Sequence, residues 1–538
     1  MVAMDTNENL FRRLEQLNEI GASLSKERDI DSLLEQILVA AKNITHADGG
    51  TLYRMSEDGN SLRFEIVRTD SLNIALGGST GKPIAFPPLP LKNEQGQPNN
   101  AMIAVCAAIN DKTVNIADAY TEVGFDFTGT RKFDAMTGYR SKSFLTVPMK
   151  NHQNEIIGVL QLINSIDPGS GEVVVFSSSD QQLAESLGSQ AAIALTNRQL
   201  VIQLETLFES FINLINLAID EKSPYTGGHC QRVPELTMML ADAVNKTDSG
   251  PLAEFQMGDR DFYELKIAGL LHDCGKVTTP VHVVDKSTKL QTLFDRIVMV
   301  DTRFEVLKRD AEIRMLKRIL DDRAAEPELR SEYQEQIRLL DDERDFLRRV
   351  NIGGEVMSET DQQRVRDIGR LRKWSQAPGE EADFLSSDEI ENLTIRAGTL
   401  TAGERETINH HIVATIKMLE NLPWPNHLKN VAEYAGGHHE RMDGKGYPKG
   451  LTRDQMSVQA RMMGIADIFE ALTADDRPYK KGMKLSQAMG IMANFKRNGH
   501  IDPDLFDVFV RQGVYLRYAE QFLDAQQIDA IDEDAVLK

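Results

Sequence analysis

The chain is poor in cysteine, since only Cys106, Cys230 and Cys274 occur among its 538 residues and none forms a CxxC pair. Three scattered cysteines exclude a disulfide framework and favour a reducing compartment. Basic residues are also scarce, because 61 Lys and Arg face 82 Asp and Glu and leave a net charge of −21. Such a chain lacks the basic face of a general nucleic-acid binder, so no nucleic-acid polymer is expected as a partner.

Long apolar runs are missing as well. No uninterrupted apolar stretch approaches the roughly 20 residues that a membrane span needs. The N-terminus is polar and acidic, without the apolar centre of a signal peptide. The expectation is therefore a cytoplasmic protein with no membrane span. A small anionic substrate stays open, because a metal site supplies its own local positive charge.

What is present is enough chain for two or three domains. Residues 50–55 and 61–67 alternate with a period of two and predict strands around a Glu-Asp-Gly-Asn turn. Residues 144–149 and 156–163 predict a further pair of strands. The pattern predicts an α+β domain over residues 30–167, with an antiparallel sheet flanked by helices.

Within this domain, Val-Pro-Met-Lys at 147–150 followed by Ile-Gly-Val-Leu-Gln at 157–161 resembles the last hairpin of a GAF domain. The run Arg-Lys-Phe-Asp-Ala-Met-Thr-Gly-Tyr-Arg at 131–140 is similar to the GAF domains of cyclic-nucleotide phosphodiesterases and adenylyl cyclases. In those domains the Phe-Asp and Thr-Gly-Tyr elements lie beside the nucleotide pocket. The resemblance implies a sensor domain with a candidate cyclic-mononucleotide site at Phe133, Asp134, Thr137 and Tyr139. The family's usual Asn-Lys pair is replaced by Arg131-Lys132, and a dimerising GAF domain without a ligand is the alternative.

Two helical segments flank this domain. Residues 1–29 predict an N-terminal helix, and residues 168–222 predict a long connecting helix that Ser-Ser-Ser-Asp at 177–180 can cap. Apolar residues in the connecting helix repeat at alternating steps of four and three: Leu200, Leu204, Leu207, Phe211, Leu214 and Ala218. That spacing is typical of a parallel coiled coil, which predicts a signalling helix and a homodimer. A single helix packed on its own domain is the alternative.

From residue 223 to residue 500 the pattern predicts an all-helical domain with a charge-rich insert at 291–390. Two apolar stripes on either side of Pro327 indicate a helical hairpin within that insert. They comprise Phe304, Leu307, Leu316 and Leu320, then Tyr333, Ile337, Leu340 and Leu347. The charges of the insert are most simply a solvated face. Residues 501–538 are rich in Asp and Glu and predict an acidic surface tail.

The helical domain also carries the residues most capable of chemistry. An apolar run ends in His272-Asp273, with Gly275 and Lys276 just beyond. Because neighbours on a helix point about 100° apart, the imidazole can serve one metal while the carboxylate bridges to a second. Cys274 is expected to be a packing residue, since a buried free thiol behaves as a small hydrophobe.

Two later segments carry the same residue types. The tandem His438-His439 precedes a glycine-rich turn, and burying two imidazoles needs two sets of partners. Asp467 lies in an apolar helical run, where a carboxylate is costly without a counter-charge from a metal or from Arg477. Imidazole and carboxylate together suit manganese, iron, cobalt or zinc. Clustered ions of that kind activate water to attack phosphorus or a carbonyl.

Together these segments resemble the HD-GYP family of metal-dependent phosphohydrolases, over residues 223–290 and about 396–490. The matching strings are His-Asp-Cys-Gly-Lys at 272–276, His-His-Glu-Arg-Met-Asp-Gly-Lys-Gly-Tyr-Pro at 438–448, Asp467, and Asp-Arg-Pro-Tyr-Lys at 476–480. The resemblance implies an all-α HD-type domain with two divalent transition-metal ions, iron or manganese before nickel, cobalt or zinc. The implied metal ligands are His229, His272, Asp273, His411, His438, His439 and Asp467.

The assignment of two of these ligands depends on how the sequence is aligned with the family's motifs. His229 matches a further family ligand, but members that hold three metals have a Glu four residues earlier, where this chain has Tyr225. A two-metal site is therefore favoured. His411 rather than His410 matches the family's histidine, although it lies 411 − 273 = 138 positions after Asp273. The charged insert accounts for the excess, since an insert whose ends lie close together can be tolerated.

The family's chemistry implies a phosphodiesterase that hydrolyses cyclic di-GMP to pGpG and/or GMP under the control of the GAF domain. Asp273 and Lys276 are the implied catalytic residues, and Lys276, Arg477 and Lys480 are the implied contacts to the substrate's phosphates or guanine. Hydrolysis of 3′,3′-cyclic GMP-AMP is the close alternative. A second alternative is an inactive protein that binds the dinucleotide or docks partners. The Gly-Tyr-Pro run at 446–448 argues against nucleotide triphosphate hydrolysis and is expected to shape the rim of the pocket and recruit partners.

Overall fold

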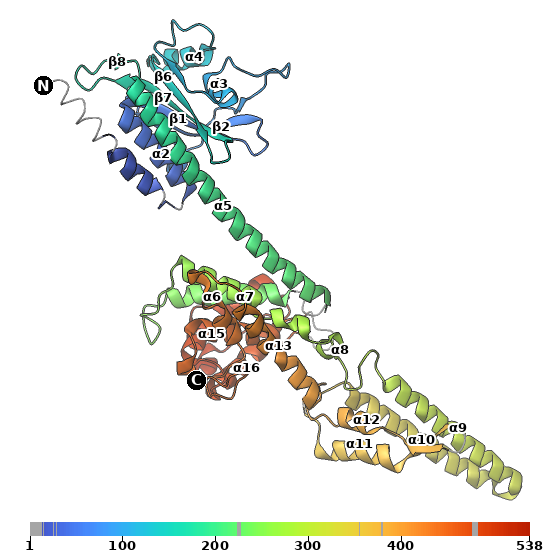
Figure 1. The fold of residues 1–538 in the computed structure, drawn as a ribbon. Coiled ribbons are helices and arrows are strands. Elements are labelled where there is room, and N and C mark those ends of the chain that lie inside the picture. Colours follow the sequence, from blue (N-terminus) through green and yellow to red (C-terminus); the bar gives the residue numbers. More distant parts are fainter. Residues whose placement is uncertain are drawn as a thin grey trace. The chain divides into compact units, whose positions relative to one another are not determined.

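The computed structural model describes residues 13, 15–24, 26–27, 29–222, 228–354, 356–377, 380–475 and 482–538. The chain forms two compact units, Met1–Leu207 and Phe208–Lys538, and the division falls within one long helix (Figure 1). Each unit has its own buried apolar core. The first unit is α+β and the second is mostly helical, as the change in apolar period predicted.

The first unit is built on one antiparallel sheet with the strand order β3-β2-β1-β7-β6-β5, to which β4 adds beside β2 and β8 beside β7. The strands are β1 (Ala47–Met55), β2 (Ser61–Thr69), β3 (Ile74–Gly77), β4 (Leu89–Pro90), β5 (Val114–Ile116), β6 (Phe144–Lys150), β7 (Ile156–Ile166) and β8 (Val173–Val174). The central pair, β1 and β7, joins the beginning of the domain to its end and places Leu52 opposite Leu160.

Helices lie on both faces of this sheet, because alternate side chains of β1 and β7 point to opposite sides. The helices are α2 (Ile30–Thr45), α3 (Ile103–Asn110), α4 (Thr128–Thr137) and the first half of α5 (Ser178–Lys222). Leu52 and Leu160 join a cluster with α2 and α5, whereas Tyr53 and Val159 pack with α3. Asp29 begins α2 by accepting a hydrogen bond from the backbone of Ser32. The predicted layout of an antiparallel sheet flanked by helices is confirmed.

The helix α5 has 45 residues, and by length and composition an 18-residue window of it is apolar enough to cross a membrane, with 11 % of that window buried. The predicted coiled-coil seam lies open on this helix: Leu200 is 50 % exposed and Leu204 is 67 % exposed. Ile212, which lies outside the seam, is 2 % exposed and packs in the core of the second unit. The pairing of this exposed stripe with a partner helix stays a prediction.

The second unit is built from helices that precede and follow an insert. Before the insert come α6 (His229–Asn245), α7 (Asp259–Leu271), the 3₁₀ helix η2 (Cys274–Thr278) and α8 (Val281–Val284). After it come α13 (Ala402–Glu420), α14 (Val431–Gly436), α15 (Val458–Thr473), α16 (Leu485–Arg497), α17 (Pro503–Arg511), α18 (Val514–Phe522) and α19 (Glu533–Leu537). α6 packs against α7 and α15, and α13 packs against η2 and α14. Segments on the two sides of the insert therefore share one core.

The insert is larger than the predicted helical hairpin. It contains α9 (Ile297–Asp321), α10 (Glu326–Asn351), α11 (Glu359–Leu371), the strand pair β9 (Lys373–Ala377) and β10 (Glu380–Asp383), and α12 (Ser387–Leu393). α9 and α10 are the predicted hairpin, and Phe304 and Leu340 of the predicted stripes are fully buried. Phe384 and Leu393 complete a separate core with them. The insert is thus a small folded body with its own apolar core.

Two buried lysines hold the ends of the insert together. Lys289, at its start, donates to the backbone carbonyls of Leu393 at 3.1 Å and Ile395 at 2.8 Å, at its end. Lys286 donates to both carboxylate oxygens of Glu404 at 2.7–2.8 Å. The chain therefore leaves the helical domain and returns to it at nearly the same place, as the sequence required of an insert between Asp273 and His411.

The segment from residue 501 onward is not the acidic surface tail that its composition predicted. α17 and α18 are amphipathic and pack in the core of the second unit, where Phe506, Phe509 and Tyr518 are at most 1 % exposed. Asp502 caps α17 and accepts hydrogen bonds from Arg453 and Arg461. The prediction failed because the composition hid the apolar sides of α17 and α18: their acidic residues Asp504, Asp507 and Glu520 lie outside the core, and most other acidic residues follow α18.

Truncating Phe509 tests this correction. We expect Phe509→Ala to lower the free energy of unfolding by about 3–5 kcal/mol, because it leaves a cavity in a packed core. Leu516→Ala on the neighbouring α18 is the control, since Leu516 is 38 % exposed and its truncation should cost well under half as much. Urea unfolding followed by circular dichroism measures both. Equal and small losses of unfolding free energy in both variants would instead support the predicted acidic surface tail.

Candidate metal centre

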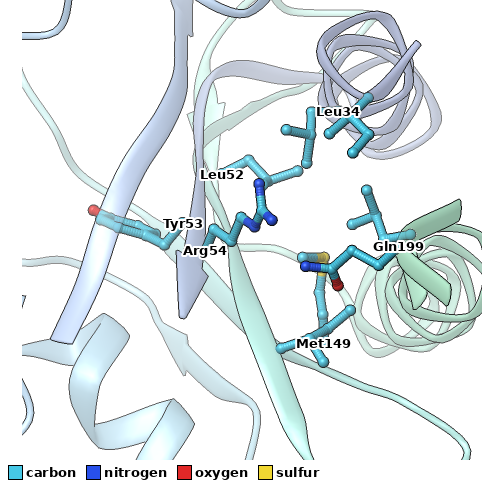
Figure 2. A pocket seen from close by; sticks show the side chains of 9 residues that line it. Leu34, Leu52, Tyr53, Arg54, Met149 and Gln199 are labelled. Atoms are coloured by element: carbon cyan, nitrogen blue, oxygen red, sulfur yellow. The ribbon is translucent and has the colours of Figure 1, made fainter. Parts of the chain in front are cut away.

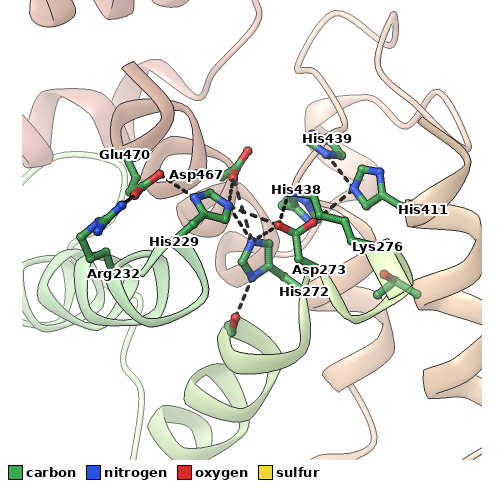
Figure 3. A network of polar contacts seen from close by, with 12 residues as sticks. His229, Arg232, His272, Asp273, Lys276, His411, His438, His439, Asp467 and Glu470 are labelled. Carbon is green, nitrogen blue, oxygen red and sulfur yellow. Dashed lines mark hydrogen bonds and ion pairs between the residues drawn. The ribbon is translucent and has the colours of Figure 1, made fainter. Parts of the chain in front are cut away.

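The structure brings the seven predicted ligand-type side chains into one cluster in the second unit (Figure 3). They come from five segments: His229 from the start of α6, His272 and Asp273 from the end of α7, His411 from α13, His438 and His439 from the turn after α14, and Asp467 from α15. Asp273 lies in the middle and is 2 % exposed. These segments lie far apart along the chain, with the insert between them, so only the fold brings them together.

One group of atoms surrounds the Oδ2 oxygen of Asp273. The Nε2 atom of His229 lies 3.2 Å from Asp273 Oδ2 and 3.2 Å from Asp467 Oδ1. The Nε2 atom of His272 lies 3.2 Å from the same oxygen of Asp273. The ligand atoms of His229, His272 and Asp467 all lie within 4.8 Å of one another, which is the spacing of groups that share one ion.

A second group lies on the other side of Asp273. His411, His438 and His439 each offer a ring nitrogen, and these atoms also lie within 4.8 Å of one another. The Nε2 atom of His411 lies 3.3 Å from Asp273 Oδ1 and 3.3 Å from the Nε2 atom of His439. Asp273 therefore directs one oxygen to each group, and its carboxylate can bridge two ions.

Three of the imidazoles are oriented by the backbone. The Nδ1 atom of His272 donates to Gly269 O at 2.7 Å, that of His411 to Ile408 O at 2.5 Å, and that of His438 to Ala435 O at 2.6 Å. A carbonyl only accepts, so Nδ1 carries the proton and the Nε2 lone pair faces the cluster. This is how proteins fix the tautomer and direction of metal-binding histidines.

His229 is oriented by a carboxylate that the sequence analysis missed. Its Nδ1 atom lies 2.5 Å from Glu470 Oε2, and Glu470 in turn accepts from Arg232 at 2.6 Å. Glu470 is fully buried and lies one helical turn after Asp467 on α15, as Arg232 lies one turn after His229 on α6. The two spacings of three residues were the available signal, because such pairs share one helix face.

The loop after His439 closes on itself through Glu440. The Glu440 carboxylate accepts from the backbone of Lys449 at 2.7 Å and of Leu451 at 2.8 Å. A Cβ atom on Gly446 would lie 2.4 Å from the backbone of Glu440, so this position admits only glycine. The closed loop lays the Tyr447 ring against His439, with the ring centroids 4.8 Å apart and the planes tilted by 25°.

Two buried atoms of the cluster have no hydrogen-bond partner within the described residues. They are Asp273 Oδ1 and His438 Nε2, and both are lone-pair acceptors in this arrangement. Leaving such atoms unpaired inside a protein is costly. A divalent cation satisfies both, and a set of imidazole and carboxylate donors suits a transition-metal ion. The residues present therefore fit divalent metal binding.

The charges of the cluster are balanced by protein cations. Burial alone would raise the pKa of Asp273, but Lys276, whose Nζ lies 2.6 Å from Asp273 Oδ2, and the neighbouring imidazoles hold that pKa well below its usual range. Burial lowers the pKa of His439 to about 4 and that of His438 well below its usual value. Asp273 is thus ionised and these two imidazoles are neutral at pH 7, the protonation states that metal ligands need.

His229 behaves differently. Burial alone would lower its pKa, but Glu470, Asp273 and Asp467 surround the ring and raise that pKa well above its ordinary value. Burial alone would raise the pKa of Glu470, but His229 and Arg232 lower it to about 2. His229 therefore carries a proton at pH 7 that a metal bound at Nε2 must displace.

The predicted substrate contacts Arg477 and Lys480, and Tyr225, lie outside the described residues, so Arg477 and Lys480 stay predictions. Arg477 as the alternative partner of Asp467 is likewise untested. Within the described residues, Asp467 faces His229 and His272. The side chain of Lys276 is 19 % exposed, and its Nζ atom is directed at Asp273.

In the first unit, the structure uses two of the predicted ligand residues internally. Asp134 is 3 % exposed and accepts hydrogen bonds from the hydroxyls of Tyr120 and Ser141. Tyr139 donates to Asp48 at 2.6 Å and accepts from Asn164. Phe133 is partly exposed and Thr137 is exposed on α4. A ligand at these four residues stays a prediction.

A different pocket lies between α2, β1 and α5 of this domain (Figure 2). Arg54 and Gln199 reach into it beside Leu34, Leu52 and Met149. Its volume of about 20 Å³ holds roughly one water molecule. It is therefore too small for a nucleotide.

Comparison with known proteins identifies both parts of the chain. Residues 29–195 match the GAF domain family and residues 385–505 match the HD domain family. The HD match includes His411, His438, His439 and Asp467 and begins after His272 and Asp273. The earlier residues therefore join the centre through the geometry described above.

Three relatives show the range of similar proteins. The chain is 40 % identical over 121 residues to a cyclic di-GMP phosphodiesterase of Pseudomonas aeruginosa. These residues make up 22 % of this chain and 28 % of that protein. It is 47 % identical over 81 residues to 3′3′-cGAMP-specific phosphodiesterase 1 of Vibrio cholerae, with 15 % and 19 % covered. It is 30 % identical over 184 residues to the dual 3′,5′-cyclic-AMP and -GMP phosphodiesterase 11A of Takifugu rubripes, with 34 % and 18 % covered. The matches span less than a third of each relative's length.

Metal uptake should release a proton from His229. We expect metal-depleted protein to release about one proton per chain from this residue when a divalent ion binds at pH 7, because its pKa lies well above its ordinary value without the ion. The release should shrink as the pH rises through that pKa, since the proton has then already left. Calorimetric titration with Mn²⁺ in buffers of different ionisation enthalpy measures it. His229→Asn should not release this proton. A wild type that releases none would show that His229 does not bind the ion.

Proposed function

We propose, for a chain that joins a GAF domain to an HD domain of the HD-GYP type, that it is a metal-dependent phosphodiesterase that hydrolyses cyclic dinucleotides, with cyclic di-GMP as the first candidate. The observation that carries the proposal is the position of Asp273, whose two oxygens face two separate groups of ligand-type atoms. Bridging carboxylates of this kind are typical of sites that hold two ions for phosphate chemistry.

We assign as ligands the seven residues of the cluster: His229, His272, Asp273, His411, His438, His439 and Asp467. The residues fit two divalent transition-metal ions, with iron or manganese favoured and nickel, cobalt or zinc as alternatives. Bound ions of this kind supply a nucleophile from water at neutral pH and positive charge for the phosphate oxygens. His229 in this set is supported by its Nε2 atom, which lies 3.2 Å from both carboxylates of its group.

The chain's own residues prepare the site for an anionic substrate. Lys276 keeps Asp273 ionised and uses one of its three N–H donors on that carboxylate. Its remaining donors can contact a substrate phosphate, because the side chain is 19 % exposed at the edge of the centre. Hydrolysis opens one phosphodiester bond to give the linear pGpG, and a second hydrolysis gives GMP. Arg477 and Lys480 are proposed as further contacts to phosphate or guanine.

Two relatives favour different substrates, since one is named for cyclic di-GMP and another for 3′3′-cGAMP. Hydrolysis of 3′,3′-cyclic GMP-AMP is therefore the second candidate function. An inactive binding protein is disfavoured, because the seven ligand-type residues and Lys276 are all in place. For the GAF domain, we keep a cyclic mononucleotide as the proposed regulatory ligand.

We also propose that two copies of the chain pair through α5. The seam residues Leu207, Phe211 and Leu214 are 53–58 % exposed, although they are large and apolar. With Leu200 and Leu204 they keep the steps of four and three that bring side chains of two parallel helices together. A second copy of the same helix offers the matching stripe.

Hydrolysis of cyclic dinucleotides tests the enzymatic proposal. We expect full-length protein loaded with Mn²⁺ or Fe²⁺ to convert cyclic di-GMP, cyclic GMP-AMP or both to linear products that chromatography resolves. Asp273→Asn should lower the turnover by about 1,000-fold or more, since bridged ions contribute several kcal/mol of charge stabilisation.

Glu264→Gln is the matched control for this experiment. Glu264 is a buried carboxylate of the same unit, but it accepts hydrogen bonds from Asn430, and among the described residues no hydrogen bond or ion pair joins it to the centre. Its variant should keep the turnover of the wild type. If metal-loaded wild type and Asp273→Asn are equally inert on both substrates, the protein binds dinucleotides or partners without cleaving them.

A charge placed in the α5 seam tests the pairing. We expect the wild type to sediment as a dimer and Leu207→Glu to sediment as a monomer, because two like charges would face each other in the seam. Thr206→Glu is the control, since it adds the same charge one residue away, at an exposed position outside the seam. Analytical ultracentrifugation separates the two states. A monomeric wild type, or a dimeric Leu207→Glu, would contradict the pairing.

A further inference from the structure

One imidazole of the centre is held differently from the others. His229, His272, His411 and His438 each have a hydrogen-bond partner for Nδ1. Within the described residues, the Nδ1 atom of His439 has no such partner. Its ring instead contacts three other rings: His438 at 4.1 Å, His411 at 5.1 Å, and Tyr447 at 4.8 Å between centroids. Of these, Tyr447 is the one that lies nearly parallel to it, at 25°.

We propose that Tyr447 is the positioning residue of His439, and that the stacked phenol ring fixes the direction of this imidazole in place of a hydrogen bond. The proposal rests on the proposed metal centre and adds a role for the tyrosine of the Gly-Tyr-Pro run. It revises our expectation that this run serves mainly as a pocket rim and a partner surface.

The loop is built to deliver the ring to this place. The backbone N–H of Tyr447 donates to the carbonyl of His439 at 3.3 Å, which ties the two residues together directly. Glu440 fixes the far end of the loop through Lys449 and Leu451. Gly446 lets the chain pass against the backbone of Glu440, where any side chain would clash. The aromatic face is therefore supported on both sides along the chain.

The need for support is greatest at His439. It is the partly exposed member of its group, whereas His411 and His438 are buried. The group of His411, His438 and His439 also has fewer carboxylates, because it faces one oxygen of Asp273. The group of His229 and His272 faces both Asp273 and Asp467. An ion in the three-histidine group thus depends more on the direction of each imidazole.

The hydroxyl of Tyr447 has an alternative role that must be separated from stacking. Burial, with the nearby carboxylates of Asp467 and Asp273, raises the pKa of this phenol, so it stays neutral at pH 7. A neutral hydroxyl near the centre can donate a hydrogen bond to a substrate or to the ligands. Removing the hydroxyl alone, by Tyr447→Phe, distinguishes this role from that of the ring.

The test is metal binding by the full-length protein, with Mn²⁺ as the probe. Metal-depleted wild type, Tyr447→Phe and Tyr447→Leu are titrated, and bound metal is counted by atomic emission and by electron paramagnetic resonance of the free ion. We expect the wild type and Tyr447→Phe to bind two ions with the same affinities. Tyr447→Leu should keep the tighter site and bind its second ion about 10-fold or more weakly, as when an orienting partner of a metal ligand is lost.

Tyr434→Leu is the matched control, because Tyr434 is a buried tyrosine on the neighbouring α14 that packs in the apolar core, and among the described residues no ring contact joins it to a ligand imidazole. It should lower the thermal stability without changing the affinity of the second site. Near-wild-type circular dichroism of Tyr447→Leu excludes misfolding as the cause.

The outcomes separate this proposal from the proposed function. Equal weakening in Tyr447→Phe and Tyr447→Leu assigns the role to the hydroxyl and overturns stacking. Two tight ions in Tyr447→Leu also overturn it, with the metal centre intact. A wild type that binds no Mn²⁺ or Fe²⁺ overturns the metal centre itself and the positioning role with it.

Discussion

The second unit depends on the charge balance around Asp273. A buried carboxylate has a desolvation penalty of several kcal/mol unless cations compensate it, and here Lys276 and the protonated His229 do so. The compensation requires α7 to end at His272 and the chain to turn back through η2 at once. Gly275 in η2 lets α13 approach closely, since a Cβ atom there would lie 2.0 Å from the carbonyl oxygen of His411. The same glycine therefore brings α13 and its histidine against Asp273.

Helix ends solve the second problem of the centre, which is to aim its imidazoles. The last carbonyl groups of a helix have no partner within the helix. His272 lies directly after the last residue of α7, and His438 lies just after α14. Each uses a carbonyl three residues earlier, Gly269 or Ala435, as the acceptor for Nδ1. A histidine placed just past a helix end thus satisfies the backbone and directs its free nitrogen inward at the same time.

The sequence predicted what depends on residue type and order, and failed where several segments must be seen together. The apolar periods predicted the sheet and the helical unit, and the His and Asp residues indicated a metal centre. Glu470 escaped because it reads as an ordinary polar residue until α6 and α15 meet and set it beside Arg232. The acidic composition after residue 500 concealed the apolar sides of α17 and α18. Asp134 matched a ligand motif, yet its carboxylate is used within the GAF domain by Tyr120 and Ser141.

The closed ends of the insert bear on how such a domain can vary. Lys286 and Lys289 clamp the departing and returning chain, so the body between them is a side branch whose size does not enter the geometry of the centre. In terms of chain connectivity, a short turn from Lys289 to Leu393 would serve equally well. The distance in sequence between Asp273 and His411 therefore says little about whether they belong to one centre. Related chains can gain or lose the insert without a change in the geometry of the centre.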